Sequence, residues 1–123
     1  MKLVYASRTN NIERIVQKLN LPEEQLLNIS NGYSGVINEE YCLFTYTDML
    51  GSIPKVVDDF LKINHKYLKG VAGSGNRNFG ANFCLAAEKI SIKYGVELLA
   101  KFELAGSDKE IERFKKKYKE LFS

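Results

Sequence analysis

The chain has 123 residues, of which 18 are Lys or Arg and 15 are Asp or Glu, so its formal net charge is +3. This positive excess is too small to indicate a nucleic-acid-binding surface, and the lysines have no interleaved aromatic pattern. The length fits one domain, 1–123. The sequence contains no secretory signal and no apolar run of membrane-spanning length, so we expect a cytoplasmic protein with no nucleic-acid or membrane partner. Cys42 and Cys84 form no CxxC motif, so we expect two free, buried thiols.

Five short apolar segments have the character of strands, and amphipathic segments alternate with them. The expected strands are 2–6, 26–29, 41–46, 67–73 and 96–103. This alternation predicts an α/β fold, in which a doubly wound, five-stranded parallel sheet is covered by helices on both faces. Only residues 30–40 connect the second and third strands, which is near the minimum for a parallel crossover. We therefore expect the helix of that crossover to be missing or reduced.

The helices are predicted from their apolar faces and from their ends. Asn10 followed by Glu13, and Ser107 followed by Glu110, both have capping-box spacing at the start of a helical pattern. Pro54 suits the first turn of another helix. A further helical pattern begins near Phe79 and is terminated by Gly95.

Three polar or glycine-rich loops follow the first, third and fourth strands, and in a doubly wound sheet these carboxyl ends meet at the ligand site. We call them the first loop (7–11), the middle loop (47–51) and the third loop (74–80). The candidate ligand residues are Ser7, Arg8, Thr9, Asn10, Asn11, Thr47, Asp48, Met49, Leu50, Gly51, Ser74, Gly75, Asn76, Asn78, Phe79 and Gly80.

Each loop has a functional and a purely structural interpretation. Hydroxyl and amide side chains before a helix can bind a phosphate, but the same residues also serve as ordinary helix caps. Met49, Leu50 and Phe79 could enclose a flat ring, or they could only cover the end of the sheet. The glycines and asparagines of the third loop also suit a tight strand-to-helix connection.

Other common sites are absent from the sequence. There is no GxxxxGK[ST] motif, no GxGxxG motif after the first strand and no metal-ligand spacing. His65 is the only histidine, and we interpret it as a surface group; Asp58 and Asp59 are adjacent on a helix and therefore diverge. We predict no metal site.

The three loops together resemble those of NrdI, a family of small flavodoxin-like proteins. The resemblance rests on residues 69–80 with the run SGNRNFG, on residues 101–107 with KFELAGS, on Thr45 to Pro54 in the middle, and on Ser7, Thr9 and Asn11. It covers nearly the whole chain. Asn10 and Met49 depart from the family pattern, which commonly has glycine at both positions. Met49 would resist any conformation that needs a positive φ.

The resemblance implies a flavodoxin-like fold, an FMN cofactor and no catalytic side chain, because the flavin carries the chemistry. It also implies a redox-active accessory protein, which takes electrons from a donor and reacts with O2. The resulting oxidant would activate the dimanganese site and tyrosyl radical of the small subunit of class Ib ribonucleotide reductase. We expect Ser52 and Arg77 to contact that partner, although Arg77 could instead hold its own loop. The alternatives are an electron-carrier flavodoxin and a flavin-free binding module of the same fold.

Overall fold

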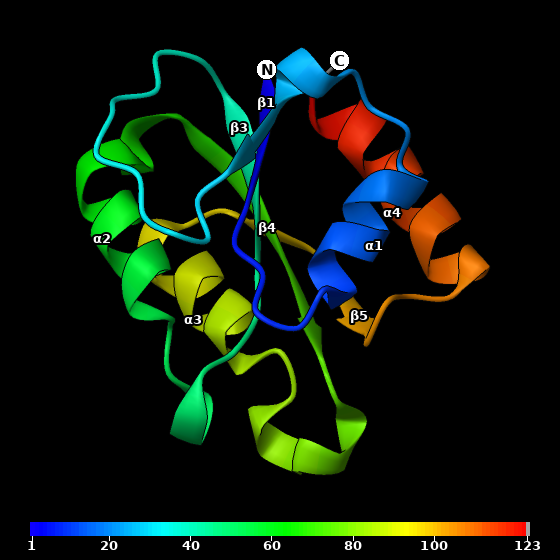
Figure 1. The fold of residues 1–123 in the computed structure, drawn as a ribbon. Coiled ribbons are helices and arrows are strands. Elements are labelled where there is room, and N and C mark those ends of the chain that lie inside the picture. The colour runs from blue at the N-terminus through cyan, green and yellow to red at the C-terminus, as the bar shows by residue number, and fades with distance from the viewer. Residues whose placement is uncertain (123) are drawn as a thin grey trace.

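The computed structural model describes residues 1–122, and they form a five-stranded parallel sheet (Figure 1). The strands are β1 (Lys2–Tyr5), β2 (Leu26–Asn28), β3 (Tyr41–Thr45), β4 (Leu68–Gly75) and β5 (Glu97–Glu103). Their order is β2-β1-β3-β4-β5, and every neighbouring pair is parallel. The predicted fold class is confirmed, including the shortened crossover: residues 29–40 contain no helix.

Four helices cover the two faces of the sheet: α1 (Asn11–Lys18), α2 (Lys55–Asn64), α3 (Leu85–Tyr94) and α4 (Asp108–Leu121). Helices α1 and α4 pack on one face, and α2 and α3 pack on the other (Figure 1). No helix among residues 1–122 has the length and apolar character needed to cross a membrane.

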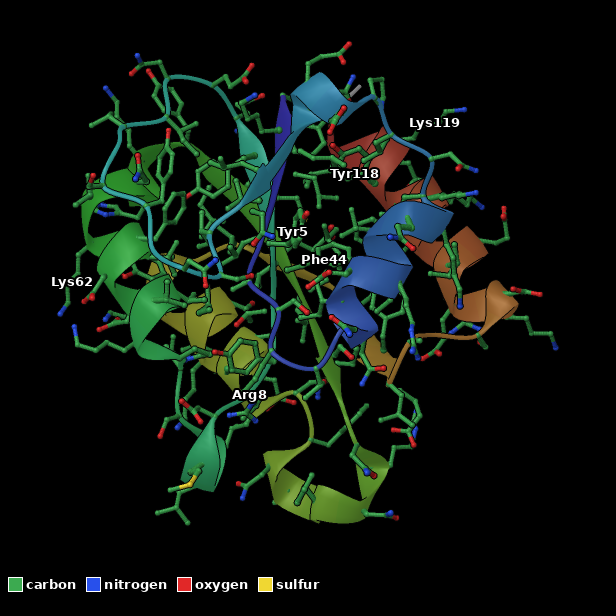
Figure 2. The ribbon with its side chains drawn as sticks, viewed as in Figure 1. Tyr5, Arg8, Phe44, Lys62, Tyr118 and Lys119 are labelled. Atoms are coloured by element: carbon green, nitrogen blue, oxygen red, sulfur yellow. The ribbon has the colours of Figure 1, made fainter. Side chains whose placement is uncertain are left out.

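The core is divided by the sheet into two apolar clusters. Phe44 of β3 meets Phe114 of α4 edge to face at 4.9 Å, and Tyr118 completes this cluster on the side of α1 and α4 (Figure 2). On the other side, Phe60 of α2 packs against Tyr41 with ring centroids 5.7 Å apart. Lys62 of α2 points away from the sheet into solvent (Figure 2). Because both faces of the sheet are buried, the strand sequences are continuous apolar runs and do not alternate between apolar and polar residues.

One buried side chain organises the crossover that lacks a helix. The Asn64 carboxamide accepts a hydrogen bond from the Ile37 amide at 2.7 Å and donates to the Gly35 carbonyl at 3.0 Å. The Tyr41 hydroxyl donates to the Asn64 carbonyl at 2.6 Å. Because buried backbone groups need partners, this amide satisfies groups that a helix would otherwise satisfy internally.

Two sequence expectations about helix starts are wrong. Asn10 precedes α1 with φ of 67° and makes no side-chain capping bond, so no capping box forms there. The helix expected from Phe79 begins at Leu85, because Gly80 (φ 55°, ψ −120°) and Cys84 (φ 54°) interrupt the helical path. Residues Arg77–Asn82 instead form 3₁₀ turns. The Ser107–Glu110 capping box is present in full.

Candidate functional site

A cleft of about 490 Å³ lies where β1, β3 and β4 end. In Figure 1 the middle loop and the 3₁₀ turns of the third loop project beyond this edge of the sheet. The cleft brings together most of the predicted ligand residues: Ser7, Arg8, Thr9, Asn11, Thr47, Asp48, Met49, Leu50, Gly51, Ser74, Gly75, Asn76 and Phe79. Asn10, Asn78 and Gly80 belong to the same loops but do not line the cleft, and neither do Ser52 and Arg77.

The first loop presents polar groups at the N-terminus of α1. The Ser7 amide donates to Ser30 Oγ at 2.9 Å, whereas the buried Ser7 hydroxyl has no hydrogen-bond partner among residues 1–122. The Asn11 side chain donates to Thr9 Oγ1 at 3.4 Å. A buried hydroxyl without a partner is unusual and costs free energy. Ser7 lines the same cleft as Asn11, the first residue of α1, and the first amides of a helix have no intrahelical partners. This arrangement suits an anionic ligand group.

Arg8 connects the first loop to the middle loop across the cleft. Its guanidinium donates to Asp48 Oδ1 at 2.9 Å and lies 4.8 Å from the centroid of the Tyr46 ring. Figure 2 shows Arg8 at the end of the sheet where the loops gather. Both partners are partly solvated, so the ion pair orients the loops more than it stabilises the fold.

The middle loop is a tight 3₁₀ turn with two left-handed residues. The Asp48 carboxylate accepts a bond from the Met49 amide at 2.9 Å, and Leu50 (φ 58°) and Gly51 (φ 81°) follow. The positive φ therefore falls on Leu50 and Gly51, and Met49 has no positive φ. Met49 and Leu50 are 78% and 90% exposed, so the loop presents apolar side chains to solvent beside the cleft.

The third loop is held by its own side chains and by β5. Asn76 Oδ1 accepts a bond from the Asn78 amide at 2.9 Å, and the Arg77 amide donates to Glu103 Oε2 at 2.8 Å. The Arg77 guanidinium lies 4.9 Å from the centroid of the Phe83 ring, and it donates to no carbonyl within residues 1–122. The backbone of Cys84 approaches Gly75 so closely that a Cβ at Gly75 would lie 3.2 Å from the Cys84 nitrogen. A side chain at Gly75 would therefore fit only if the Cys84 backbone shifted by a few tenths of an ångström.

Six lining residues were not predicted from the sequence: Ile12, Tyr46, Asn82, Phe83, Cys84 and Leu104. Leu104 follows β5 directly, has φ of 53°, and donates its amide to the Gly75 carbonyl at 2.8 Å. The rule that ligands bind at the carboxyl ends of strands could have indicated it. Cys84 is buried, and burial raises the pKa of its thiol from 9.0 to about 12, so the thiol stays protonated near neutral pH.

Comparison with known proteins gives a family and a fold. Residues 3–116 match the family described as NrdI Flavodoxin like. The chain belongs to this NrdI flavodoxin-like family. Among solved structures it is similar to a short-chain flavodoxin associated with a non-canonical PDU bacterial microcompartment, with 22% identity, a TM-score of 0.64, and coverage of 98% of this chain and 95% of that one. It is also similar to oxidised flavodoxin 2 from Bacillus cereus, with 20% identity, a TM-score of 0.66, and coverage of 99% and 98%. At these identities the two structures establish the flavodoxin-like fold alone.

The NrdI family implies a flavin cofactor, and the residues of the cleft fit one. A flavin needs a polar end for its side chain and an apolar slot for its ring. The first loop supplies the polar end, with the unpartnered Ser7 hydroxyl. Apolar surface is supplied by Met49 and Leu50 of the middle loop, by Phe79 of the third loop and by Tyr46, which precedes the middle loop.

Proposed function

We propose that the cleft binds FMN and that this NrdI family member activates the radical-bearing small subunit of class Ib ribonucleotide reductase. The observation that carries the FMN assignment is the buried Ser7 hydroxyl, which lacks a partner among residues 1–122 and stands before α1 at the polar end of the cleft. A phosphate there would accept from this hydroxyl, from Thr9 and from the first amides of α1. A bound flavin would supply one- and two-electron transfer and, once reduced, reaction with O2.

The side chains around the cleft would orient the ring and limit the access of water. Met49, Leu50 and Phe79 are 78%, 90% and 69% exposed, and all three line the cleft. Contiguous exposed apolar residues on a small protein mark a binding surface. We propose that they cover the ring and also form the centre of the surface that docks on the reductase subunit, with Ser52 and Arg77 at its edge. An oxidant formed at the ring would then pass to the partner over a short, enclosed path.

The FMN assignment is tested by comparing FMN with riboflavin, which lacks the phosphate. Ser7→Ala combined with Thr9→Ala should weaken FMN binding by about a hundredfold or more, because two charge-assisted hydrogen bonds of about 1.5–3 kcal/mol each are lost. Riboflavin affinity should change little. Fluorescence titration measures both affinities, and equal losses for the two ligands would show that these residues only cap α1.

The partner assignment is tested with the small subunit from the same organism, loaded with manganese. The reduced protein and O2 should generate the subunit's tyrosyl radical, measured by electron paramagnetic resonance, and Leu50→Glu should reduce the yield even when enough FMN is added to saturate the cleft. Lys62→Glu, on the far helix α2, is the control. If no radical forms while the protein still passes electrons to other redox proteins, the electron-carrier alternative is supported instead.

A further inference from the structure

The middle loop is attached to helix α3 by three contacts that involve no ligand. The Ala86 amide donates to Thr47 Oγ1 at 3.0 Å, at one end of the loop. Lys89 Nζ donates to the Gly51 carbonyl at 2.8 Å, at the other end. Between them, Gly51 packs so closely on Leu85 that a Cβ would collide with that side chain. The loop therefore rests on the first half of α3.

The Gly51 carbonyl is the critical point of this attachment. Gly51 is buried and left-handed, and its amide already donates to the Asp48 carbonyl at 3.1 Å. Because Lys89 donates to the Gly51 carbonyl, both the N–H and the C=O of Gly51 have hydrogen-bond partners. A hydrogen bond from a charged donor is stronger than one from a neutral donor, so Lys89 makes the strongest of the three contacts between the loop and α3. The adjacent Leu50 has φ of 58°, a conformation that a non-glycine residue keeps only when its surroundings hold it.

We propose that Lys89 is a positioning residue, which fixes the Gly51–Ser52 peptide and so sets the shape of the cleft's middle wall. Its side chain does not line the cleft, so it acts through Gly51, which does. The ammonium also places a positive charge behind that wall, and this charge favours a ligand that becomes more negative on reduction. This second consequence rests on the proposed FMN function, whereas the first does not.

Lys93 provides a matched control on the same helix. It lies one turn further along α3, and its Nζ is 3.9 Å from Asp58 Oδ1, on the side of α2. Substitution of either lysine removes one positive charge from α3, but only substitution of Lys89 releases the Gly51 carbonyl. A difference between the two variants therefore reports the contact and the position of the Lys89 ammonium, and not the net charge of the helix.

The first test uses the protein without flavin. We expect Lys89→Met to increase the exchange of the Gly51 and Ser52 amides with water by about tenfold, because local opening of the loop becomes easier. Lys93→Met should leave these rates unchanged, and Lys89→Arg, which keeps a charged donor, should restore most of the protection. Amide exchange is measured by NMR. Unchanged exchange in Lys89→Met would overturn the proposal.

The second test uses FMN and its reduction potentials. We expect Lys89→Met to raise the Kd of reduced FMN more than that of oxidised FMN, so that the ratio of the two changes by about three- to tenfold, while Lys93→Met changes it by less than about twofold. Equal ratios in the two variants would overturn the charge effect. If the wild-type protein binds no FMN, the proposed function fails, and the amide exchange still decides whether Lys89 positions the loop.

Discussion

Strained single residues are concentrated around the cleft. Five non-glycine residues have a positive φ: Asn10, Asn20, Leu50, Cys84 and Leu104, among residues 1–122. Three of these line the cleft, and Asn10 lies in the first loop. A left-handed conformation costs a non-glycine residue about 1–2 kcal/mol, so the site is less stable than its surroundings. Strain of this kind commonly accompanies a binding function.

Leu50 offers the clearest test of this strain. Leu50→Gly should raise the free energy of unfolding by about 0.5–1 kcal/mol, because relief of the left-handed strain exceeds the extra chain entropy of glycine. Met49→Gly is the control, since Met49 is similarly exposed and has no positive φ. Met49→Gly should not raise the free energy of unfolding. Urea unfolding measures both variants, and an equal response at the two positions would exclude backbone strain as the cause.

At the scale of elements, the same sequence pattern has two different outcomes. Asn10 with Glu13 and Ser107 with Glu110 have identical spacing, but only the second pair caps a helix. Ser107 has φ of −84° and ψ of 165°, the extended conformation that an N-cap needs. Asn10 is left-handed, and its side chain makes no capping bond to the amides of α1. The pattern carries no information on φ, so the sequence could not separate the two.

Substitutions at Ser107 and at Asn10 should therefore change the free energy of unfolding differently. Ser107→Ala should lower the free energy of unfolding by about 1 kcal/mol, because it removes the capping bond to the Glu110 amide. Asn10→Gly should raise that free energy or leave it unchanged, because glycine adopts a positive φ without strain. Both are measured by urea unfolding of the flavin-free protein. A large loss of stability in Asn10→Gly would show that the Asn10 side chain stabilises α1 after all.

For the whole molecule, the sequence predicted the sheet better than it predicted the segment that precedes α3. The strands and the shortened crossover followed from apolar periodicity and connection length, which depend on neighbouring residues. The start of α3 depended on the left-handed Gly80 and Cys84, and Cys84 is not a residue that signals such a conformation. Phe83 matched the helical period but lies before the helix, against Arg77. Leu104 lies at the site only because β5 pairs with β4 and so brings its end next to the third loop.

The buried acids of the core predict how stability changes in alkaline solution. Burial raises the pKa of Cys84 from 9.0 to about 12 and that of Tyr118 from 10.0 to about 12. Above about pH 9 the unfolded chain loses protons that the native state retains, so the native state binds more protons and stability falls as pH rises. Below the unfolded pKa values this contribution is fully present.

Urea unfolding at pH 7, 9 and 10.5 measures this decline. Cys84→Ala should reduce its slope, because one of the groups that ionise only in the unfolded state is removed. Stability that is constant up to pH 10.5 would contradict the raised pKa values. The Cys84→Ser variant keeps the polar character without a titratable thiol, and it should show the same shallow slope.

The strand order also bears on how the chain folds as it is synthesised. Leu3 of β1 pairs with Leu26 and with Cys42, so three strands can associate once residue 45 has been made. The third loop can form only much later in synthesis, because the Arg77 amide bonds to Glu103 and the Gly75 carbonyl bonds to the Leu104 amide. The pocket is therefore finished only when the end of β5 has left the ribosome. We expect the cofactor to join an almost complete chain and to play no part in guiding the first half of the sheet.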